Sequence, residues 1–169
     1  MTAWTKVAFM ANFLVNFLVA GCATPQQKIT SQSDAVSTWR GRLAVRVNDA
    51  EPKNFSAGFE LTGNALAGEM ILFTPLGGTA ALLTWNPQAA TMRVDGNVQH
   101  HLSLKALIGQ VIGIEIPVDA LFSWLAGKPV VADGWNPDLT QRANGRVTAK
   151  RTAPDPSVEI RLVLDQDQD

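Results

Sequence analysis

Residues 42–47 are Arg-Leu-Ala-Val-Arg-Val, a run in which every second residue is a branched aliphatic. This alternation predicts a β-strand with one buried face, because successive side chains of a strand point to opposite sides. Residues 48–53 have the composition of a turn, and residues 55–61 alternate again with Phe55, Ala57, Phe59 and Leu61 on one face. The sequence therefore predicts an antiparallel hairpin.

Further strands are expected after this hairpin. The segments with strand patterns, separated by Gly-, Pro- and Asn-rich turns, are 69–74, 79–85, 91–98, 135–141, 146–152 and 158–164. Residues 70–73 and 80–83 are apolar on both faces, whereas a strand with one solvated face should alternate. We expect both faces of these two strands to be covered.

Two short helices interrupt the strands. Ser103 is a candidate N-cap, and the apolar residues that follow it recur with helical spacing until Gly113, which predicts a helix over 104–112. A second stripe of the same spacing, Val118, Leu121, Phe122 and Leu125, follows Pro117, with Gly127 and Pro129 as stop signals, which predicts a second helix after Pro117.

The fold class that these elements predict is α+β. It has an antiparallel sheet of at least seven strands, with two helices that need an apolar surface to cover. A flat sheet would leave the doubly apolar strands in water, so we expect it to curl into an unclosed barrel, a half-barrel, with the short helices as a lid over its opening.

The first 21 residues have the parts of a secretory signal peptide, namely Lys6, an apolar run from Val7 to Ala20 and small residues at its end. The run is shorter than the roughly 20 residues of a membrane-spanning helix. It ends in Val19-Ala20-Gly21-Cys22, and Cys22 is the only cysteine of the chain. A small-small-Cys ending resembles the bacterial lipobox, in which the cysteine receives diacylglycerol and an N-acyl chain. We therefore expect a signal peptide over 1–21, lipidation of Cys22 and a flexible polar tether over 22–38.

The remaining residues, 39–169, have room for a single domain. The chain carries 14 basic and 15 acidic residues without a basic cluster, which argues against nucleic-acid binding. His100 and His101 would point to opposite faces of a strand, so they would not share a metal ion. No phosphate-binding glycine motif and no Gly-x-Ser-x-Gly motif occurs, and we expect a protein that is not an enzyme and has no cofactor or metal.

Several motifs together resemble the outer-membrane lipoprotein receptor family LolB of the lipoprotein localisation pathway. They are the lipobox at Cys22, Trp39-Arg40-Gly41-Arg42-Leu43-Ala44-Val45, Pro75-Leu76-Gly77, and Ile116-Pro117-Val118 through Trp124-Leu125-Ala126-Gly127-Lys128-Pro129. The resemblance covers nearly the whole of 22–169 and is weakest after Pro129, where the strands are shorter than in longer members.

The resemblance implies a receptor anchored by lipid in the outer membrane and facing the periplasm. It would accept cargo lipoproteins from the periplasmic carrier LolA, hold their acyl chains in an apolar cavity and insert them into outer-membrane lipid. We expect a monomer. Ala23 follows the lipidated cysteine, and Asp at that position usually marks retention in the inner membrane, so the sorting rule also indicates the outer membrane.

The resemblance also assigns candidate site residues. Pro75, Leu76 and Gly77 would form a protruding membrane-insertion loop; the competing interpretation is a leucine folded back onto the barrel rim. The cavity would be lined by Phe55, Phe59, Met70, Leu72, Leu83, Met92, Leu104, Leu107, Ile108, Leu121, Phe122 and Leu125. Such stripes more often form a filled core.

Two other functions remain open on the sequence. A structural or assembly lipoprotein would bind a protein partner through its apolar sheet and have a dry core. A lipoprotein hydrolase would need a polar catalytic triad, for which the sequence offers no candidate.

Overall fold

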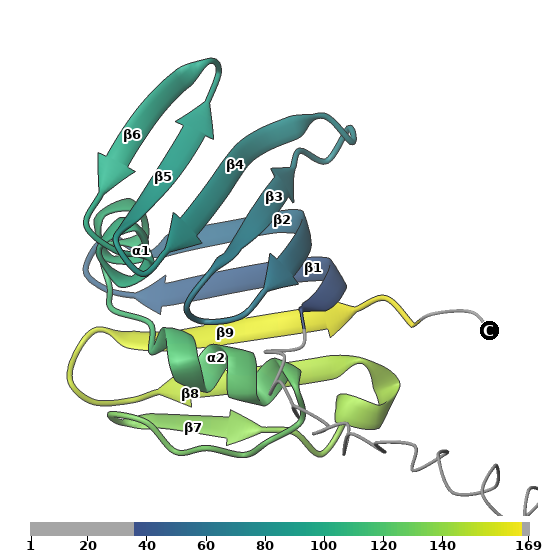
Figure 1. Cartoon of the computed structure of the whole chain (residues 1–169). Helices are drawn as coiled ribbons and strands as arrows, with labels where there is room; N and C mark the ends of the chain where they lie inside the picture. The colour runs from purple at the N-terminus through teal and green to yellow at the C-terminus, as the bar shows by residue number, and fades with distance from the viewer. Residues whose placement is uncertain (1–35, 167–169) are drawn as a thin grey trace, which may run out of the picture. The chain divides into compact units, whose positions relative to one another are not determined.

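Figure 1 shows the computed structural model, which describes residues 36–166. Signal peptide, Cys22 and most of the predicted tether lie outside the described residues. The strands are β1 (Ser37–Asn48), β2 (Lys53–Gly63), β3 (Gly68–Phe73), β4 (Thr79–Asn86), β5 (Ala89–Val94), β6 (Asn97–His101), β7 (Trp135–Asp138), β8 (Arg146–Arg151) and β9 (Ser157–Leu164). The helices are α1 (Leu104–Ile112), α2 (Val118–Leu125) and the short 3₁₀ helix η1 (Arg142–Asn144).

One antiparallel sheet contains all nine of these strands, in the order β6-β5-β4-β3-β2-β1-β9-β8-β7. The two edge strands, β6 and β7, do not pair with each other, so the sheet is unclosed. The sheet is strongly coiled, since β5 and β6 run steeply across the direction of β1 and β9 in Figure 1. These features agree with the predicted half-barrel.

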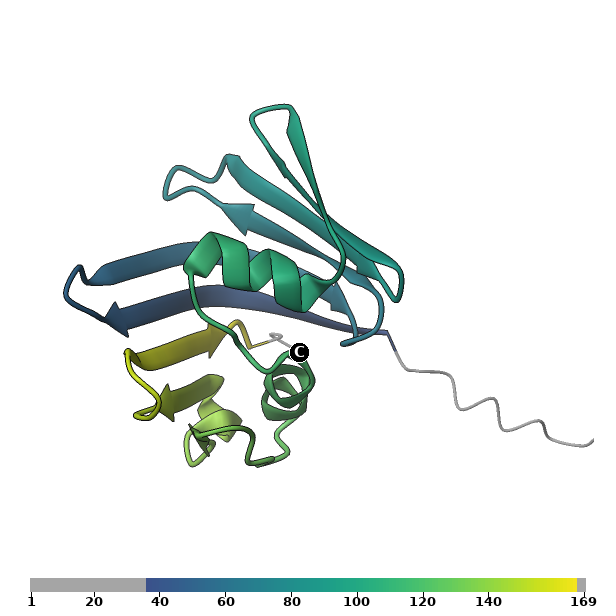
Figure 2. The same cartoon turned by 90° about the vertical axis from the view of Figure 1, so that its left-hand side faces the viewer.

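Both α-helices lie on the concave side of the sheet. In Figure 2, α1 crosses in front of the middle of the sheet, and in Figure 1 α2 lies in front of β8 and β9. The predicted ends of α1 are confirmed: the Ser103 hydroxyl oxygen accepts a 3.1 Å hydrogen bond from the Ala106 amide, and Gly113 closes the helix with a positive φ of 81°. α2 begins directly after Pro117, as predicted, and ends at Leu125, just before the predicted stop signals Gly127 and Pro129.

The single strand predicted over 91–98 is wrong. Residues 95 and 96 form a turn between β5 and β6, and Asp95 and Gly96 have positive φ angles of 48° and 82°. Two positive φ angles in a row are typical of a type I′ hairpin turn, for which Asp-Gly is a preferred pair. The local Asp-Gly signal therefore outweighs the continuous alternation of the neighbouring residues.

Other bounds shift by a few residues. β1 begins at Ser37, so the last two residues of the predicted tether belong to the sheet. β7 ends at Asp138, three residues before the predicted end. There the Asp138 carboxylate accepts hydrogen bonds from the amide and the hydroxyl of Thr140, and these local bonds replace the ladder of a strand.

A hydrophobic core runs between the sheet and the helices, and within residues 36–166 its buried members lie between Val45 and Leu164. Trp124 and Trp135 are its largest fully buried side chains, with ring centroids 6.0 Å apart.

Candidate functional site: an apolar cavity in the half-barrel

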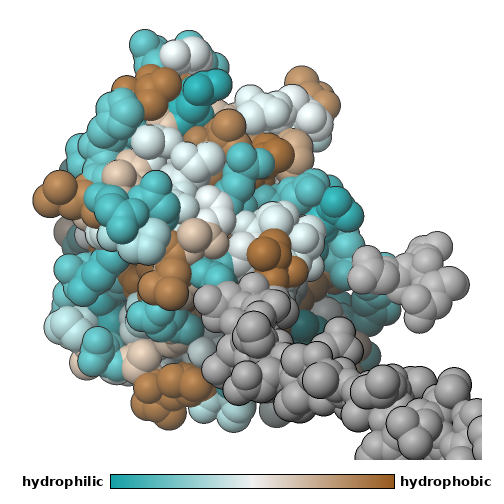
Figure 3. Space-filling model, in the orientation of Figure 1, coloured by the Kyte–Doolittle hydropathy of each residue, from teal (hydrophilic) through white to brown (hydrophobic). Residues whose placement is uncertain are grey.

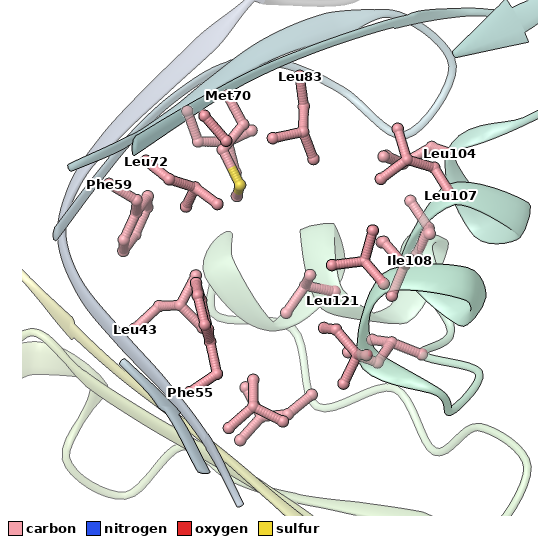
Figure 4. Close-up of a pocket in the computed structure, with 18 of the residues that line it drawn as sticks. Leu43, Phe55, Phe59, Met70, Leu72, Leu83, Leu104, Leu107, Ile108 and Leu121 are labelled. Carbon is pink, nitrogen blue, oxygen red and sulfur yellow. The ribbon is translucent and has the colours of Figure 1, made fainter. Parts of the chain in front are cut away.

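A cavity of about 390 Å³ lies between the concave face of the sheet and the two α-helices. The volume falls within the range of about 300–1,000 Å³ that is usual for ligand pockets. Among the described residues that line it, only Lys53 and Asn54 are polar or charged, apart from the indole nitrogen of Trp85. Figure 4 shows labelled side chains from the strands and from α1 pointing into the same open space.

The sheet forms one wall of the cavity, because every second side chain of its strands points inward. Leu43, Val45 and Val47 of β1 line the cavity, while Arg42 and Arg46 point to the outer face. On β2, Phe55, Phe59 and Leu61 continue this inner surface. The period-two pattern of the sequence is thus the direct cause of an apolar wall.

The helices supply the opposite wall. Leu104, Leu107 and Ile108 of α1 recur at helical spacing and face the cavity, as do Leu121 and Phe122 of α2. Leu107 is only 1% exposed, whereas its neighbours Leu104 and Ile108 are half-buried. Leu107 anchors α1, and its neighbours contact the hollow space.

Aromatic rings form one end of the cavity region. The Phe122 ring lies 5.7 Å from Trp39 in an edge-to-face arrangement and 6.2 Å from Trp85. The Trp85 indole donates a 2.9 Å hydrogen bond to the Asn64 carbonyl oxygen, so its polar atom is satisfied. Gly68 leaves the space for this indole, because a Cβ at Gly68 would lie 2.5 Å from the Trp85 ring.

All twelve residues that the sequence assigned to the cavity lie in its lining: Phe55, Phe59, Met70, Leu72, Leu83, Met92, Leu104, Leu107, Ile108, Leu121, Phe122 and Leu125. Sequence reasoning missed further lining residues, among them Leu43, Val45, Val47, Trp85 and Lys53. The first three carry a signal that could have found them, because their common face on the first strand was already evident from the alternation.

The cavity has a mouth beside the C-terminal end of α1. Phe55 is 42% exposed and Val111 is 53% exposed, although both line the cavity. Lys53 and Asn54, the polar lining residues, immediately precede Phe55 in β2. Solvent therefore reaches the apolar interior at this point.

The turn between β3 and β4 carries Leu76 at its tip. The Gly77 amide donates a 2.9 Å hydrogen bond to the Thr74 carbonyl oxygen, as in a type I turn with Pro75 and Leu76 at the central positions. The Leu76 side chain is 99% exposed, so it is not packed onto the barrel rim in this structure. Figure 3 shows that apolar areas on this face of the molecule are scattered among hydrophilic ones.

The outer face of the sheet carries ion pairs. The Arg40 guanidinium lies 2.9 Å from the Glu60 carboxylate, and its hydrogen bond lowers the pKa of Glu60. Burial alone would raise the pKa of Glu159, but hydrogen bonds from Arg161 and Lys150 outweigh this effect and lower it. These charges lie on the opposite face of the sheet from the cavity, which keeps the interior apolar.

Within residues 36–166, no group of three or more His, Cys, Asp and Glu side chains is arranged to hold a metal ion. The helices of the described part are all too short or too polar to cross a bilayer.

An unclosed antiparallel sheet with two helices on its concave side and an apolar cavity between them defines a protein of the half-barrel class. A family model described as outer membrane lipoprotein LolB matches residues 37–155. The chain belongs to this LolB family.

Curated relatives agree with this assignment. The outer-membrane lipoprotein LolB of Shewanella woodyi is 32% identical over 162 residues, which cover 91% of this chain and 75% of that protein. The protein of the same name from Bordetella petrii is 25% identical, with 98% of this chain and 95% of that protein covered. The one from Chromobacterium violaceum is 28% identical, with coverages of 90% and 80%.

Proposed function

We propose that this protein is a lipid-anchored receptor at the periplasmic face of the outer membrane, which accepts lipoproteins by binding their acyl chains and inserts them into the membrane. The observation that carries the proposal is the apolar cavity of about 390 Å³, which opens to solvent beside Phe55 and Val111. Membership of the outer-membrane lipoprotein LolB family supports the location and the receptor role.

The cargo arrives on the periplasmic carrier LolA, and no nucleotide drives the transfer. Its direction follows from rising affinity for acyl chains along the route from carrier to receptor to bilayer. Each buried methylene contributes about 0.8 kcal/mol, so a difference of two methylenes changes the partition more than tenfold. A hollow interior suits an intermediate acceptor, because it leaves room for chains without filling that room with its own side chains.

α1 and α2 act as the lid of this cavity. α1 is held by one deeply buried residue, Leu107, while Leu104, Ile108 and Val111 are partly exposed. A helix with so few anchoring contacts can shift outward when chains enter, at a small cost in burial.

Cys22 carries the anchor, an N-acyl diacylglycerol group. Three acyl chains exceed the two membrane signals that stable attachment requires. Residues 23–36 then separate the anchor from β1, which starts at Ser37. The receptor works as a monomer without a cofactor, and it is not an enzyme.

The test is transfer from the donor. A radiolabelled lipoprotein bound to LolA is mixed with the chain from residue 23 onward, which retains the entire described core. We expect the label to move to the receptor and to stay there in the absence of membranes. A stoichiometric complex that leaves the label on LolA would instead support an assembly lipoprotein that binds a protein partner, and would overturn the proposal.

A further inference from the structure

The inner wall of β2 begins with a lysine. Lys53 pairs directly with Val47 of β1, which lines the cavity, so Lys53 belongs to the inward-facing row that continues with Phe55, Ala57 and Phe59. Within the described part of the chain, it is the only charged residue in the lining of the cavity. The row is otherwise apolar, and the exception stands at its open end.

The Lys53 side chain extends from β2 across the mouth of the cavity, so that its ammonium lies near the C-terminal end of α1. A Cβ placed on Gly113 would be 3.4 Å from the Lys53 Nζ atom, so this atom reaches the C-terminal cap of α1 on the opposite wall. The last turn of a helix carries partial negative charge on its free carbonyl groups, which attracts a cation to this position. An ammonium group has three donors, and the helix end does not require all of them.

Within residues 36–166, none of the four ion pairs includes Lys53. Asp49 and Glu51 lie nearby in the β1–β2 turn, but both are exposed and neither takes part in these pairs. Glu115, just beyond Gly113, is paired with Lys105 at 3.0 Å. The cation at the mouth is thus available to a ligand.

An amphiphile in this cavity would place its chain among the apolar walls and its head group at the mouth, where Phe55 and Val111 meet solvent. We propose that Lys53 gives the cavity a preference for amphiphiles with an anionic head group, a carboxylate or a phosphate, by pairing with that group at the mouth. This inference rests on the proposed function, because it presupposes that acyl chains occupy the cavity.

The expected preference is modest. Lys53 is exposed, and an exposed ion pair changes an equilibrium by about two- to fivefold. The preference should shrink as salt is raised, since screening at an exposed site is effective.

The experiment uses the chain from residue 23 onward with an uncharged apolar fluorescent dye in the cavity. Dodecanoate, dodecyl phosphate and dodecanol, which share one chain length, displace the dye at pH 8 and low ionic strength. In Lys53→Met we expect dodecanoate and dodecyl phosphate to bind about two- to fivefold more weakly, with dodecanol unchanged. Lys128→Met is the matched control, because Lys128 is an exposed lysine that does not line the cavity.

Each outcome decides the matter. Weakening of only one of the two anions supports the inference and identifies the head group as carboxylate or phosphate. Equal weakening of all three ligands, or of none, overturns it, since Lys53 would then act on the fold or not at all. Failure of every ligand to displace the dye from the unmodified chain overturns the proposed function itself.

Discussion

Leu76 is an exposed apolar side chain at a turn position that usually carries a polar residue. It is 99% exposed at the tip of a hydrogen-bonded turn, where polar residues are the usual choice. The family resemblance implied a protruding loop at residues 75–77, and the competing interpretation was a leucine folded back onto the barrel rim. The structure has it pointing outward, and insertion of such a side chain into lipid would contribute roughly 1.5–3 kcal/mol.

Replacement of Leu76 by glutamate should block delivery but leave the fold intact. The side chain contacts nothing that holds the turn, whose bonds are made by the backbone and by the Thr74 hydroxyl. We expect Leu76→Glu to accept labelled lipoprotein from LolA normally and to release at least tenfold less of it into liposomes, consistent with the loss of roughly 1.5–3 kcal/mol of insertion free energy.

Leu102→Glu is the matched control, because Leu102 is also a highly exposed leucine, at 87%, and lies outside the β3–β4 turn. It should release cargo at the normal rate. Equal release by the two variants would contradict the role of the turn.

The position of Lys53 at the mouth of the cavity could not be predicted from the sequence around it. It stands at the end of a turn segment, 48–53, where a lysine is unremarkable. Its importance depends on strand parity at the first residue of β2 and on the nearby end of α1, which comes much later in the chain. The sequence pattern predicts the strand parity, but it does not predict that the end of α1 lies close to Lys53.

At the scale of elements, the sequence predicts the ends of the helices more accurately than the ends of the strands. Ser103, Gly113 and Pro117 mark helix ends through caps and a missing amide, which are local effects, and the predicted bounds of α1 and the predicted start of α2 are those observed. The prediction of one strand over 91–98 was wrong because the alternation of side chains continues across a two-residue turn without interruption. Asp95-Gly96 was the signal that should have divided it.

Ile71 and Leu82 show another limit at this scale. We expected both faces of β3 and β4 to be covered, yet these two residues are direct partners that are only half-buried, and both α-helices line the cavity on the other face. Apolar residues on the outer face cover each other in part, which a pattern of single strands does not disclose.

A bond from η1 fixes the C-terminal end of α2. The Arg142 guanidinium donates two hydrogen bonds, of 2.9 and 2.7 Å, to the Leu125 carbonyl oxygen. Leu125 and Phe122 both line the cavity, so this bond holds one of its walls. Sequence pattern carries no indication of it, because the partners are 17 residues apart and belong to different elements.

Replacement of Arg142 by methionine should loosen α2. Hydrogen bonds from a charged donor contribute about 1.5–3 kcal/mol, and since Arg142 is partly exposed we expect a loss at the lower end, about 1.5 kcal/mol. Urea unfolding of Arg142→Met measures it, with Arg146→Met, an exposed arginine on β8, as the control that should change little. Equal stabilities of the two variants would show that the bond does not hold the helix.

At the scale of the whole molecule, the sequence predicted which faces are apolar and that the sheet would curl, since both follow from strand parity and from the need to bury two helical stripes. It could not predict that the enclosed space is hollow. A filled core and a lined cavity have the same pattern of apolar residues, and the difference lies in the coiling of nine strands and in how closely α1 approaches β5. The volume is a property of the assembly of all these elements.

A hollow interior implies a conflict between stability and ligand uptake, because unfilled space forfeits packing contacts. Ala81 on β4 is 6% exposed and lines the cavity opposite the helices. Ala81→Phe would place a ring in that space, so we expect it to raise the free energy of unfolding by about 1 kcal/mol while weakening dye and acyl-chain binding at least tenfold. Ala44→Leu, which enlarges a half-buried side chain on the outer face of β1, should leave binding unchanged. Destabilisation by Ala81→Phe would indicate that the space is already filled in solution, whereas a more stable variant that binds acyl chains as before would place the ligand elsewhere on the molecule.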